Sequence, residues 1–371
     1  MMEISCSNCG SSYPPGGLPY CCPICGGLYD FHTPLPFDPA CVDKSQPGIW
    51  RYRHIFGLSP DLAPVSLGEG NTPLVWADVF ERKIAFKCEF LNPTGSFKDR
   101  GSAVIVGWLK SRRISQAVED SSGNAGASFA AYAARAGIKA RVFVPESASG
   151  PKRRQIEAYG TELVQVPGTR TDVTEAVKAS VEGDIKYASH AYLPFNLPGY
   201  ATTAYEIYEQ LGNRIPGAVI LPAGQGGLLL GLAHGFESLH IAYNEMSNIP
   251  RIVGVQAHVC APLWAIFNTA TSEAESITEN WTLAEGVRVL HPMRGDAVIR
   301  TVTASHGLMC VVDENEIIPS RDALAHLGFY VEPTSAIVWP ALKKTIQELP
   351  DPIVVILTGS GYKYDQDGER N

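Results

Sequence analysis

The sequence contains no hydrophobic run long enough to cross a membrane. A membrane-spanning helix needs about 20 consecutive apolar residues, and every apolar stretch of this chain is interrupted before that length. The first residues, MMEISCSNCG, also lack the basic segment followed by an apolar segment that marks a secretory leader. These two absences predict a cytoplasmic protein.

An excess of positive charge is also missing. The 371 residues include 30 Lys and Arg against 38 Asp and Glu, which gives a formal net charge of -8. This balance argues against a general binder of nucleic acids, although it permits a local basic pocket around a phosphate. The 35 Gly and 27 Pro residues follow no triplet period, which excludes a collagen-like fibre. The hydrophobic content of 45% indicates instead a globular chain large enough for two lobes.

Five of the nine cysteines lie within the first 25 residues. CSNCG and CPICG are two CxxC units, and two such turns can supply the four thiolates of a tetrahedral zinc site. The expected ligands are Cys6, Cys9, Cys22 and Cys25. Because four thiolates leave no coordination position for water, we expect this zinc to stabilise the N-terminal segment and to take no part in catalysis.

Other interpretations of the cysteine cluster remain open at this point. The thiols could form disulfides in a secreted protein or act as redox groups, and the absence of a leader disfavours both. A zinc ribbon can also bind nucleic acid, but this one carries almost no Lys or Arg. The scattered cysteines are expected to be small buried apolar side chains. They are Cys41, Cys88, Cys260 and Cys310.

After a proline-rich linker that ends near residue 45, short apolar runs alternate with segments of helical periodicity. Helices are expected to begin near Ser96 and at the turn before an alanine-rich run that ends at Gly137. Strands are expected within IAFKCE, QAVEDSS, KARVFVPE, TELVQVPG, AVILPAG, RIVGVQA and PIVVILTGSG. Such alternation is typical of an α/β protein in which helices cover parallel sheets.

Four glycine-containing turns each follow an expected strand, at the sheet edge where α/β proteins bind ligands. The first turn, NPTGSFKDR, places Lys98 at the start of a helix. The positive end of a helix dipole lowers the pKa of an amine, and a neutral amine can form a Schiff base. An isolated lysine in this position would more often be an ordinary surface residue next to Asp99 and Arg100, and it is the surrounding turn that favours the Schiff base.

The other three turns offer complementary groups. SSGNAG provides backbone N–H groups and the Asn124 amide for a carboxylate or phenolate oxygen. PAGQGG forms a nest of N–H groups for a phosphate, although it matches neither the dinucleotide-binding nor the P-loop pattern. LTGSGYK places the hydroxyls of Thr358 and Ser360 where one can meet a ring nitrogen, although such hydroxyls often cap backbone. An amine, an amide, a phosphate nest and a hydroxyl together match pyridoxal 5'-phosphate.

The motifs GEGNTPL, NPTGSFKDRG, SSGNAGAS, PAGQGG and LTGSGYK follow one another in the order and approximate spacing of the threonine synthase family, within the fold type II pyridoxal-phosphate enzymes. The chain resembles this family from about residue 48 onward, and its N-terminal cysteine pattern is similar to that of several threonine synthase-like proteins. The resemblance implies a two-domain α/β fold, similar to the tryptophan synthase β subunit, with a small N-terminal zinc ribbon. The expected parts are residues 1–45 for the zinc knuckle and linker, 46–101 with 201–371 for the large cofactor-binding domain, and 102–200 for the small inserted domain.

The same resemblance implies roles for individual residues. Lys98 carries the cofactor as a Schiff base and moves protons, and Asn124 bonds the 3'-oxygen of the cofactor ring. The implied phosphate ligands are Gly224, Gln225, Gly226 and Gly227. Thr358 meets the ring nitrogen, and a neutral partner at this nitrogen favours elimination and replacement over transamination. The implied ligands of the substrate carboxylate are Ser122, Gly123 and Ala125.

Two segments depart from the family pattern, and both concern the substrate. Typical threonine synthases have segments resembling GNFDD and NSINPYRLEGQKT, where this chain has PGTRTD at residues 167–172 and SHAYLPFNLPGYATTAYEI from Ser189. In the second segment, residues 195–197 (Phe-Asn-Leu) stand near the place of an expected arginine. Either Arg170 or the basic residues 152–154 supply the missing positive charge to the substrate, or they are solvated surface charges.

The resemblance implies a homodimeric pyridoxal-phosphate lyase, namely a threonine synthase that converts O-phosphohomoserine and water to threonine and phosphate. Alternatives of the same class are a threonine or serine dehydratase, a cysteate synthase-like β-replacing enzyme and a diaminopropionate ammonia-lyase-like enzyme. An alternative of another class is a regulatory protein that binds the cofactor without catalysis.

Overall fold

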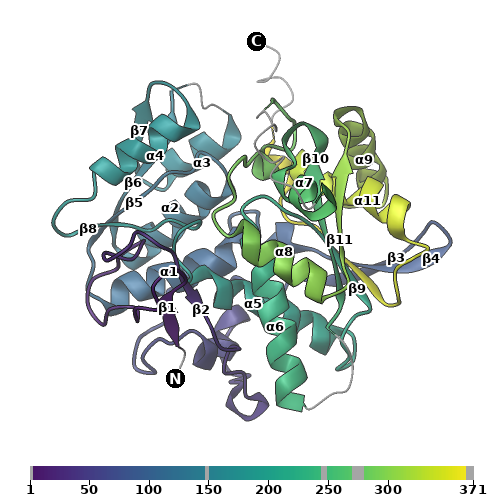
Figure 1. Cartoon of the computed structure of the whole chain (residues 1–371), viewed down its shortest axis with the longest axis horizontal. Helices are drawn as coiled ribbons and strands as arrows, with labels where there is room; N and C mark the ends of the chain where they lie inside the picture. Colours follow the sequence, from purple (N-terminus) through teal and green to yellow (C-terminus); the bar gives the residue numbers. More distant parts are fainter. Residues whose placement is uncertain (1–2, 147–149, 244–248, 270–279, 365–371) are drawn as a thin grey trace.

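The computed structural model of the chain describes residues 3–146, 150–243, 249–269 and 280–364. In this part of the chain the strands form a two-stranded, a four-stranded and a six-stranded sheet (Figure 1). None of the described helices is both long enough and apolar enough to span a membrane.

The six-stranded sheet has the strand order β11-β10-β9-β12-β4-β3. Its strands are β3 (Leu74–Val79), β4 (Arg82–Lys87), β9 (Ala218–Pro222), β10 (Arg251–Ala257), β11 (Leu308–Val312) and β12 (Ile353–Ile356). Five of them run parallel, and β3 joins β4 antiparallel at the edge. Every residue of β9 and β12 is buried, because central parallel strands are covered on both faces, and this explains their continuous apolar sequences.

The four-stranded sheet has the order β7-β6-β5-β8 and is entirely parallel. Its strands are β5 (Gln116–Glu119), β6 (Lys139–Pro145), β7 (Glu162–Val166) and β8 (Ile185–Tyr187), and its helices are α2 (Asn124–Ala136), α3 (Pro151–Ala158) and α4 (Arg170–Ala179). α2 ends at Gly137, whose φ of 70° is left-handed, as the sequence predicts. All four strands lie within residues 102–200, while the domain limits themselves stay a prediction.

The helix α5 (Asn196–Gln210) packs against both α1 (Lys98–Ser111) and α6 (Gly227–Tyr243). α5 and α6 lie in the lower middle of Figure 1. The contact between α5 and α6 depends on glycines, because a Cβ at Gly231 would lie 2.4 Å from the Tyr200 Cβ and one at Gly235 would lie 2.6 Å from the Ala201 carbonyl oxygen. The remaining helices are α7 (Pro262–Thr269), α8 (Gly295–Ala304), α9 (Glu314–His326), α10 (Pro333–Ala336) and α11 (Val338–Thr345).

The strands β1 (Ile4–Cys6) and β2 (Tyr29–Phe31) form an antiparallel N-terminal hairpin that packs on the rest of the chain. Arg294, just before α8, is 7% exposed and connects the hairpin to the loop after β8. Its guanidinium donates hydrogen bonds to the carbonyl oxygens of Tyr29 (3.0 Å), Tyr192 (2.9 Å) and Ala191, and to Asp30 Oδ2 (3.2 Å). The hairpin is therefore fixed to the same loop that enters α5.

The expectation that the scattered cysteines are buried is correct for two of them. Cys88 and Cys260 are buried, whereas Cys310 is half-buried and Cys41 is exposed. Cys41 lies in a short 3-10 helix of the proline-rich linker (Pro39–Cys41), none of whose residues is buried, so the prediction is wrong for this residue.

Candidate active site

The carboxyl ends of strands from both larger sheets open onto a cavity of about 510 Å³. The turns after β4, β5, β9 and β12 supply Lys98, residues 121–125, residues 224–227 and Thr358 to its lining. The structure therefore brings the four predicted turns together at one cavity, although they are spread over 260 positions from Lys98 to Thr358. Its volume is within the range usual for sites that bind a small molecule.

Lys98 is the first residue of α1, and its side chain lines the cavity. Its Nζ lies 4.8 Å from the ring centre of Phe97. Burial lowers the pKa of Lys98 to about 8, against the opposing effect of the carboxyl groups of Glu119 and Glu332. The direction agrees with the sequence prediction, and the largest cause is the loss of water contact on burial. About a tenth of such amines are neutral at pH 7, which makes Lys98 a usable nucleophile.

Asn124 begins α2 and lines the same cavity. Its Nδ2 donates a hydrogen bond to Glu332 Oε1 at 2.7 Å, and its Oδ1 is buried with no hydrogen-bond partner among the described residues. Lys152 Nζ lies 3.1 Å from the other oxygen of Glu332. A phenolate oxygen brought to Asn124 would therefore compete with Glu332, a residue that the sequence analysis did not single out.

The turn between β9 and α6 has the shape of an anion cradle. Gly226 has a φ of +82°, and a Cβ at this position would lie 2.2 Å from Val298 Cγ2. A Cβ at Gly224 would lie 2.6 Å from the carbonyl oxygen of Gly286. Both positions thus require glycine. Since the first N–H groups of α6 have no acceptor within the helix, this turn can surround a phosphate.

Thr358 lies two residues after the end of β12 and lines the same cavity as Lys98. Its Oγ1 is buried and makes no hydrogen bond to any described residue. Ser360, the other hydroxyl of this turn, accepts a hydrogen bond from the Tyr362 backbone nitrogen and caps a short 3-10 helix. An unpaired buried hydroxyl is costly in the absence of a ligand, which fits Thr358 as the partner of a ring nitrogen.

The predicted substrate residues Ser122, Gly123, Ala125 and Arg170 also line the cavity. Arg170 is the first residue of α4, and its Nη2 lies 3.0 Å from Asp120 Oδ2. Of the basic cluster 152–154, only Lys152 lines the cavity, whereas Arg153 pairs with Glu157 one turn further along α3. The structure thus places Arg170 and Lys152 at the cavity and leaves Arg153 and Arg154 outside its lining.

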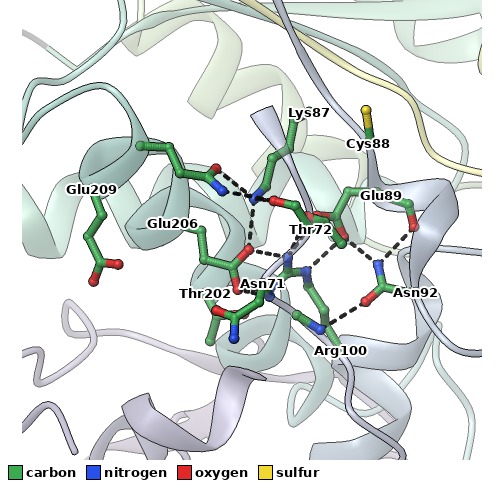
Figure 2. A network of polar contacts seen from close by, with 12 residues as sticks. Asn71, Thr72, Lys87, Cys88, Glu89, Asn92, Arg100, Thr202, Glu206 and Glu209 are labelled. Carbon is green, nitrogen blue, oxygen red and sulfur yellow. Dashed lines mark hydrogen bonds and ion pairs between the residues drawn. The ribbon is translucent and has the colours of Figure 1, made fainter. Parts of the chain in front are cut away.

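Behind the Lys98 turn lies a buried charge cluster formed by Lys87, Glu89, Arg100 and Glu206 (Figure 2). Arg100 Nε lies 2.7 Å from Glu89 Oε2, Arg100 Nη2 lies 2.7 Å from Glu206 Oε2, and Lys87 Nζ lies 2.7 Å from the same oxygen. Although burial opposes it, the Arg100 guanidinium holds the pKa of both carboxyl groups below their ordinary range. Two positive and two negative charges therefore compensate one another away from water.

The segment GEGNTPL packs against this buried charge cluster and not into the cavity. Thr72 Oγ1 donates to Glu89 Oε1 at 2.6 Å, and the backbone nitrogen of Asn71 donates to Glu206 Oε1 at 2.8 Å (Figure 2). The motif thus contributes by connecting β4, α1 and α5, which carry the cluster, beneath the turn that positions Lys98.

The chain matches known proteins over most of its length. Residues 65–359 match the family model for pyridoxal-phosphate dependent enzymes, so the chain belongs to this family. It is 32% identical over 375 residues to the threonine synthase of Methanocaldococcus jannaschii. This alignment covers 96% of this chain and 92% of that protein. The threonine synthase of Methanosarcina acetivorans is 30% identical over 377 residues, covering 97% of this chain and 91% of the relative.

Two solved structures support the fold. A threonine deaminase from T.th. has a TM-score of 0.67 at 26% sequence identity and covers 79% of this chain and 94% of its own. Maize serine racemase has a TM-score of 0.68 at 22% identity, with coverages of 80% and 90%. The expected fold class is confirmed as the α/β fold of the fold type II pyridoxal-phosphate enzymes.

The cavity fits pyridoxal 5'-phosphate by the chemistry of its lining. Lys98, whose amine has a lowered pKa, suits the aldehyde of this cofactor. The glycine turn at residues 224–227, which has no room for side chains at Gly224 and Gly226, suits its phosphate. The buried Thr358 hydroxyl, which has no partner among the described residues, suits its ring nitrogen. The residues that would hold it are Lys98, Asn124, Gly224, Gln225, Gly226, Gly227 and Thr358.

The N-terminal cysteines also fit the metal expected for them. The sulfur atoms of Cys6, Cys9, Cys22 and Cys25 all lie within 4.8 Å of one another, with 3.4 Å between Cys6 and Cys25 and 3.7 Å between Cys9 and Cys22. Four sulfurs at about 2.3 Å from a tetrahedral zinc would be separated by about 3.8 Å. The donor set and its spacing therefore suit zinc.

Proposed function

We propose that the protein is a pyridoxal-phosphate-dependent threonine synthase or a close paralogue, which converts O-phosphohomoserine and water to threonine and phosphate by β,γ-elimination and replacement. The observation that carries the proposal is the convergence of Lys98, Asn124, the 224–227 turn and Thr358 on one cavity. The similarity to threonine synthases over at least 96% of the chain in two relatives supports the same conclusion.

When bound, the cofactor would supply an electron sink for carbanion chemistry at the amino acid. Lys98 would hold the cofactor covalently and, once released by the substrate amine, move protons at the α and β carbons. Ser122, Gly123 and Ala125 lie at the start of α2, where N–H groups can bind the substrate carboxylate. Arg170 or Lys152 would face the substrate phosphate in place of the basic residue missing after Ser189.

A second candidate remains within the same class. The altered segment from Ser189, whose sequence departs from that of typical threonine synthases, enters the cavity lining through His190. This favours a paralogue with another oxygen leaving group, such as a serine or threonine dehydratase or a cysteate synthase-like enzyme. A homodimer and a cytoplasmic location belong to the proposal as further expectations from the resemblance.

The test is phosphate release with amino-acid product analysis, using purified cofactor-loaded protein and O-phosphohomoserine, with O-phosphoserine, serine and threonine in parallel. Threonine and phosphate from O-phosphohomoserine are expected. Activity on another of these substrates alone would identify the paralogue. Cofactor absorbance without turnover of any of them would contradict the proposal and favour a regulatory protein that only binds the cofactor.

We further propose that Cys6, Cys9, Cys22 and Cys25 bind a structural zinc ion. Replacing both Cys22 and Cys25 by serine should remove about one zinc ion per chain, because two ligands cannot hold the metal tightly. The metal content is measured by atomic absorption and compared with Cys41→Ser, which changes an exposed cysteine outside the cluster. Cofactor absorbance should remain in the double variant, and zinc retained in that variant would refute the assignment.

A further inference from the structure

Glu119 and His190 form a side-chain pair at the cavity that none of the cofactor roles uses. His190 Nδ1 lies 2.6 Å from Glu119 Oε1, and His190 lines the cavity beside Lys98 and Arg170. The side chain of Glu119 is 1% exposed and that of His190 is 17% exposed. They therefore form a short hydrogen bond that is mostly removed from water, in the lining of the same cavity as Lys98.

The fold fixes this pair from both sides. Glu119 ends β5, and His190 follows β8, the parallel neighbour of β5, so both leave the sheet at the same edge. The carbonyl oxygen of His190 accepts a hydrogen bond from Asn196 Nδ2 at 2.6 Å. The next residue, Ala191, is held through its carbonyl oxygen by Arg294. The imidazole is thus placed by the backbone as well as by the carboxyl group.

The environment of the pair favours a shared proton. Burial raises the pKa of the Glu119 carboxyl group, and Asp120 adds to this effect. Burial lowers the pKa of His190, with Lys98 and Arg170 acting in the same direction. The second carboxyl oxygen of Glu119, Oε2, is buried and has no hydrogen-bond partner among the described residues.

When Glu119 and His190 share one proton in addition to the hydrogen of the neutral imidazole ring, His190 Nε2 always carries a hydrogen. If the proton is on Glu119, the carboxyl O–H donates to Nδ1 and the neutral imidazole carries its hydrogen on Nε2; if it is on the imidazole, both ring nitrogens carry hydrogen. Nε2 makes no hydrogen bond to any described residue. It is consequently a donor available to a molecule in the cavity.

We propose that His190 donates a proton from Nε2 to the leaving oxygen of the substrate, with Glu119 as its positioning residue. The carbon–oxygen bond breaks, its electron pair goes to the oxygen, and the Nε2 proton joins that oxygen. The proton between the partners then resides on Nδ1 and Glu119 is a carboxylate. With a phosphate ester that is replaced by water, the water molecule that supplies hydroxide to the β carbon returns one proton to the pair. With a hydroxyl substrate that takes up no water, the proton that Lys98 removes from the α carbon returns to the pair, which closes the balance.

This inference rests on the proposed function and narrows its substrate class to amino acids with an oxygen leaving group, either a phosphate ester or a hydroxyl. It disfavours an ammonia-lyase, because an ammonium leaving group already carries its proton and would be repelled by a donor. Phosphate esters and hydroxyls both leave through an oxygen atom that needs a proton. Assaying O-phosphohomoserine and O-phosphoserine beside serine and threonine shows which of the two groups the protein accepts.

The experiment compares leaving groups that do and do not need a proton. The variants His190→Gln and Glu119→Gln are assayed with the oxygen substrate that the wild-type protein turns over, and with the chloro analogue of the same carbon chain. For O-phosphohomoserine the analogue is 2-amino-4-chlorobutanoate, and for serine or O-phosphoserine it is 3-chloroalanine. Chloride leaves without protonation. We expect a loss of kcat of about 100-fold or more on the oxygen substrate and a change below about 3-fold on the chloro analogue.

His258→Gln is the matched control, because His258 also pairs with a carboxylate, Asp313, at 2.8 Å but lies exposed and outside the cavity lining. It should match the wild type on both substrates. If His190→Gln lowers kcat equally on both substrates, or does not lower it on the oxygen substrate, His190 is not the proton donor. The proposed function would still stand in that case, because it depends on the activity of the wild-type protein. 2,3-Diaminopropionate is assayed in parallel, and a wild-type protein that turns it over but none of the oxygen substrates would overturn the inference directly. A wild-type protein inactive on every substrate would refute the proposed function itself.

Discussion

Replacing Lys98 by alanine is expected to abolish the absorbance near about 410 nm of the covalently held cofactor and to lower turnover by about 1,000-fold or more. The reason is that Lys98 lines the same cavity as the 224–227 turn and has a pKa lowered to about 8. Lys110→Ala is the matched control, because Lys110 lies in the last turn of the same helix and is exposed. An unchanged absorbance band in Lys98→Ala would disprove the assignment of the cofactor lysine.

The lowered pKa of Lys98 also predicts how cofactor attachment depends on pH. Only the neutral amine attacks an aldehyde, so the attachment rate to cofactor-free protein should rise as the pH increases through about 8. An ordinary lysine would show this rise near about 10.4. Stopped-flow absorbance at constant ionic strength measures the rate across this range.

Replacing Arg100 by alanine is expected to lower the free energy of unfolding by about 3–5 kcal/mol. Glu89 and Glu206 would both remain in the interior without the guanidinium that pairs with them at 2.7 Å. Lys87 would still contact Glu206, but no positive group among the described residues would reach both oxygens of Glu89. The measurement is a urea titration of the cofactor-loaded protein, followed by circular dichroism.

Two further variants make the Arg100 prediction specific. Lys344→Ala removes an exposed ion pair with Glu316, at 2.9 Å, and should cost less than about 1 kcal/mol. Arg100→Lys keeps the charge but cannot donate to both carboxyl groups in the same geometry, so an intermediate loss is expected. A loss in Arg100→Ala as small as that in Lys344→Ala would show that the buried charge cluster does not stabilise the fold.

The sequence was sufficient for seven of the nine described parallel strands, all except β8 and β11, and for the turns at the cavity. Apolar runs such as β9 and β12 are recognisable because burial on both faces leaves no polar position in them. The hairpin between β3 and β4 is harder to predict, since its turn residues Phe80 and Glu81 have φ values of 50° and 64° without the usual Asn or Gly.

The pair of Glu119 and His190 could not be derived from spacing in the sequence. The two residues are 71 positions apart and meet only because β5 and β8 are neighbours, although β6 and β7 lie between them in the chain. The sequence did contain two ionisable residues near strand ends. Glu119 is the last residue of β5, and His190 lies three residues after β8, within the altered segment from Ser189. Likewise, Glu332 reaches Asn124 across 208 positions.

The attachment of the N-terminal hairpin through Arg294 limits how this enzyme can be rebuilt. Tyr29 and Asp30 provide acceptors for a guanidinium that also holds Ala191 and Tyr192, the residues directly after His190. Trimming the hairpin to shorten the chain would leave that guanidinium short of acceptors and loosen the backbone next to His190 at the cavity. The hairpin and the β8–α5 loop therefore have to be exchanged together when parts of related enzymes are grafted onto one another.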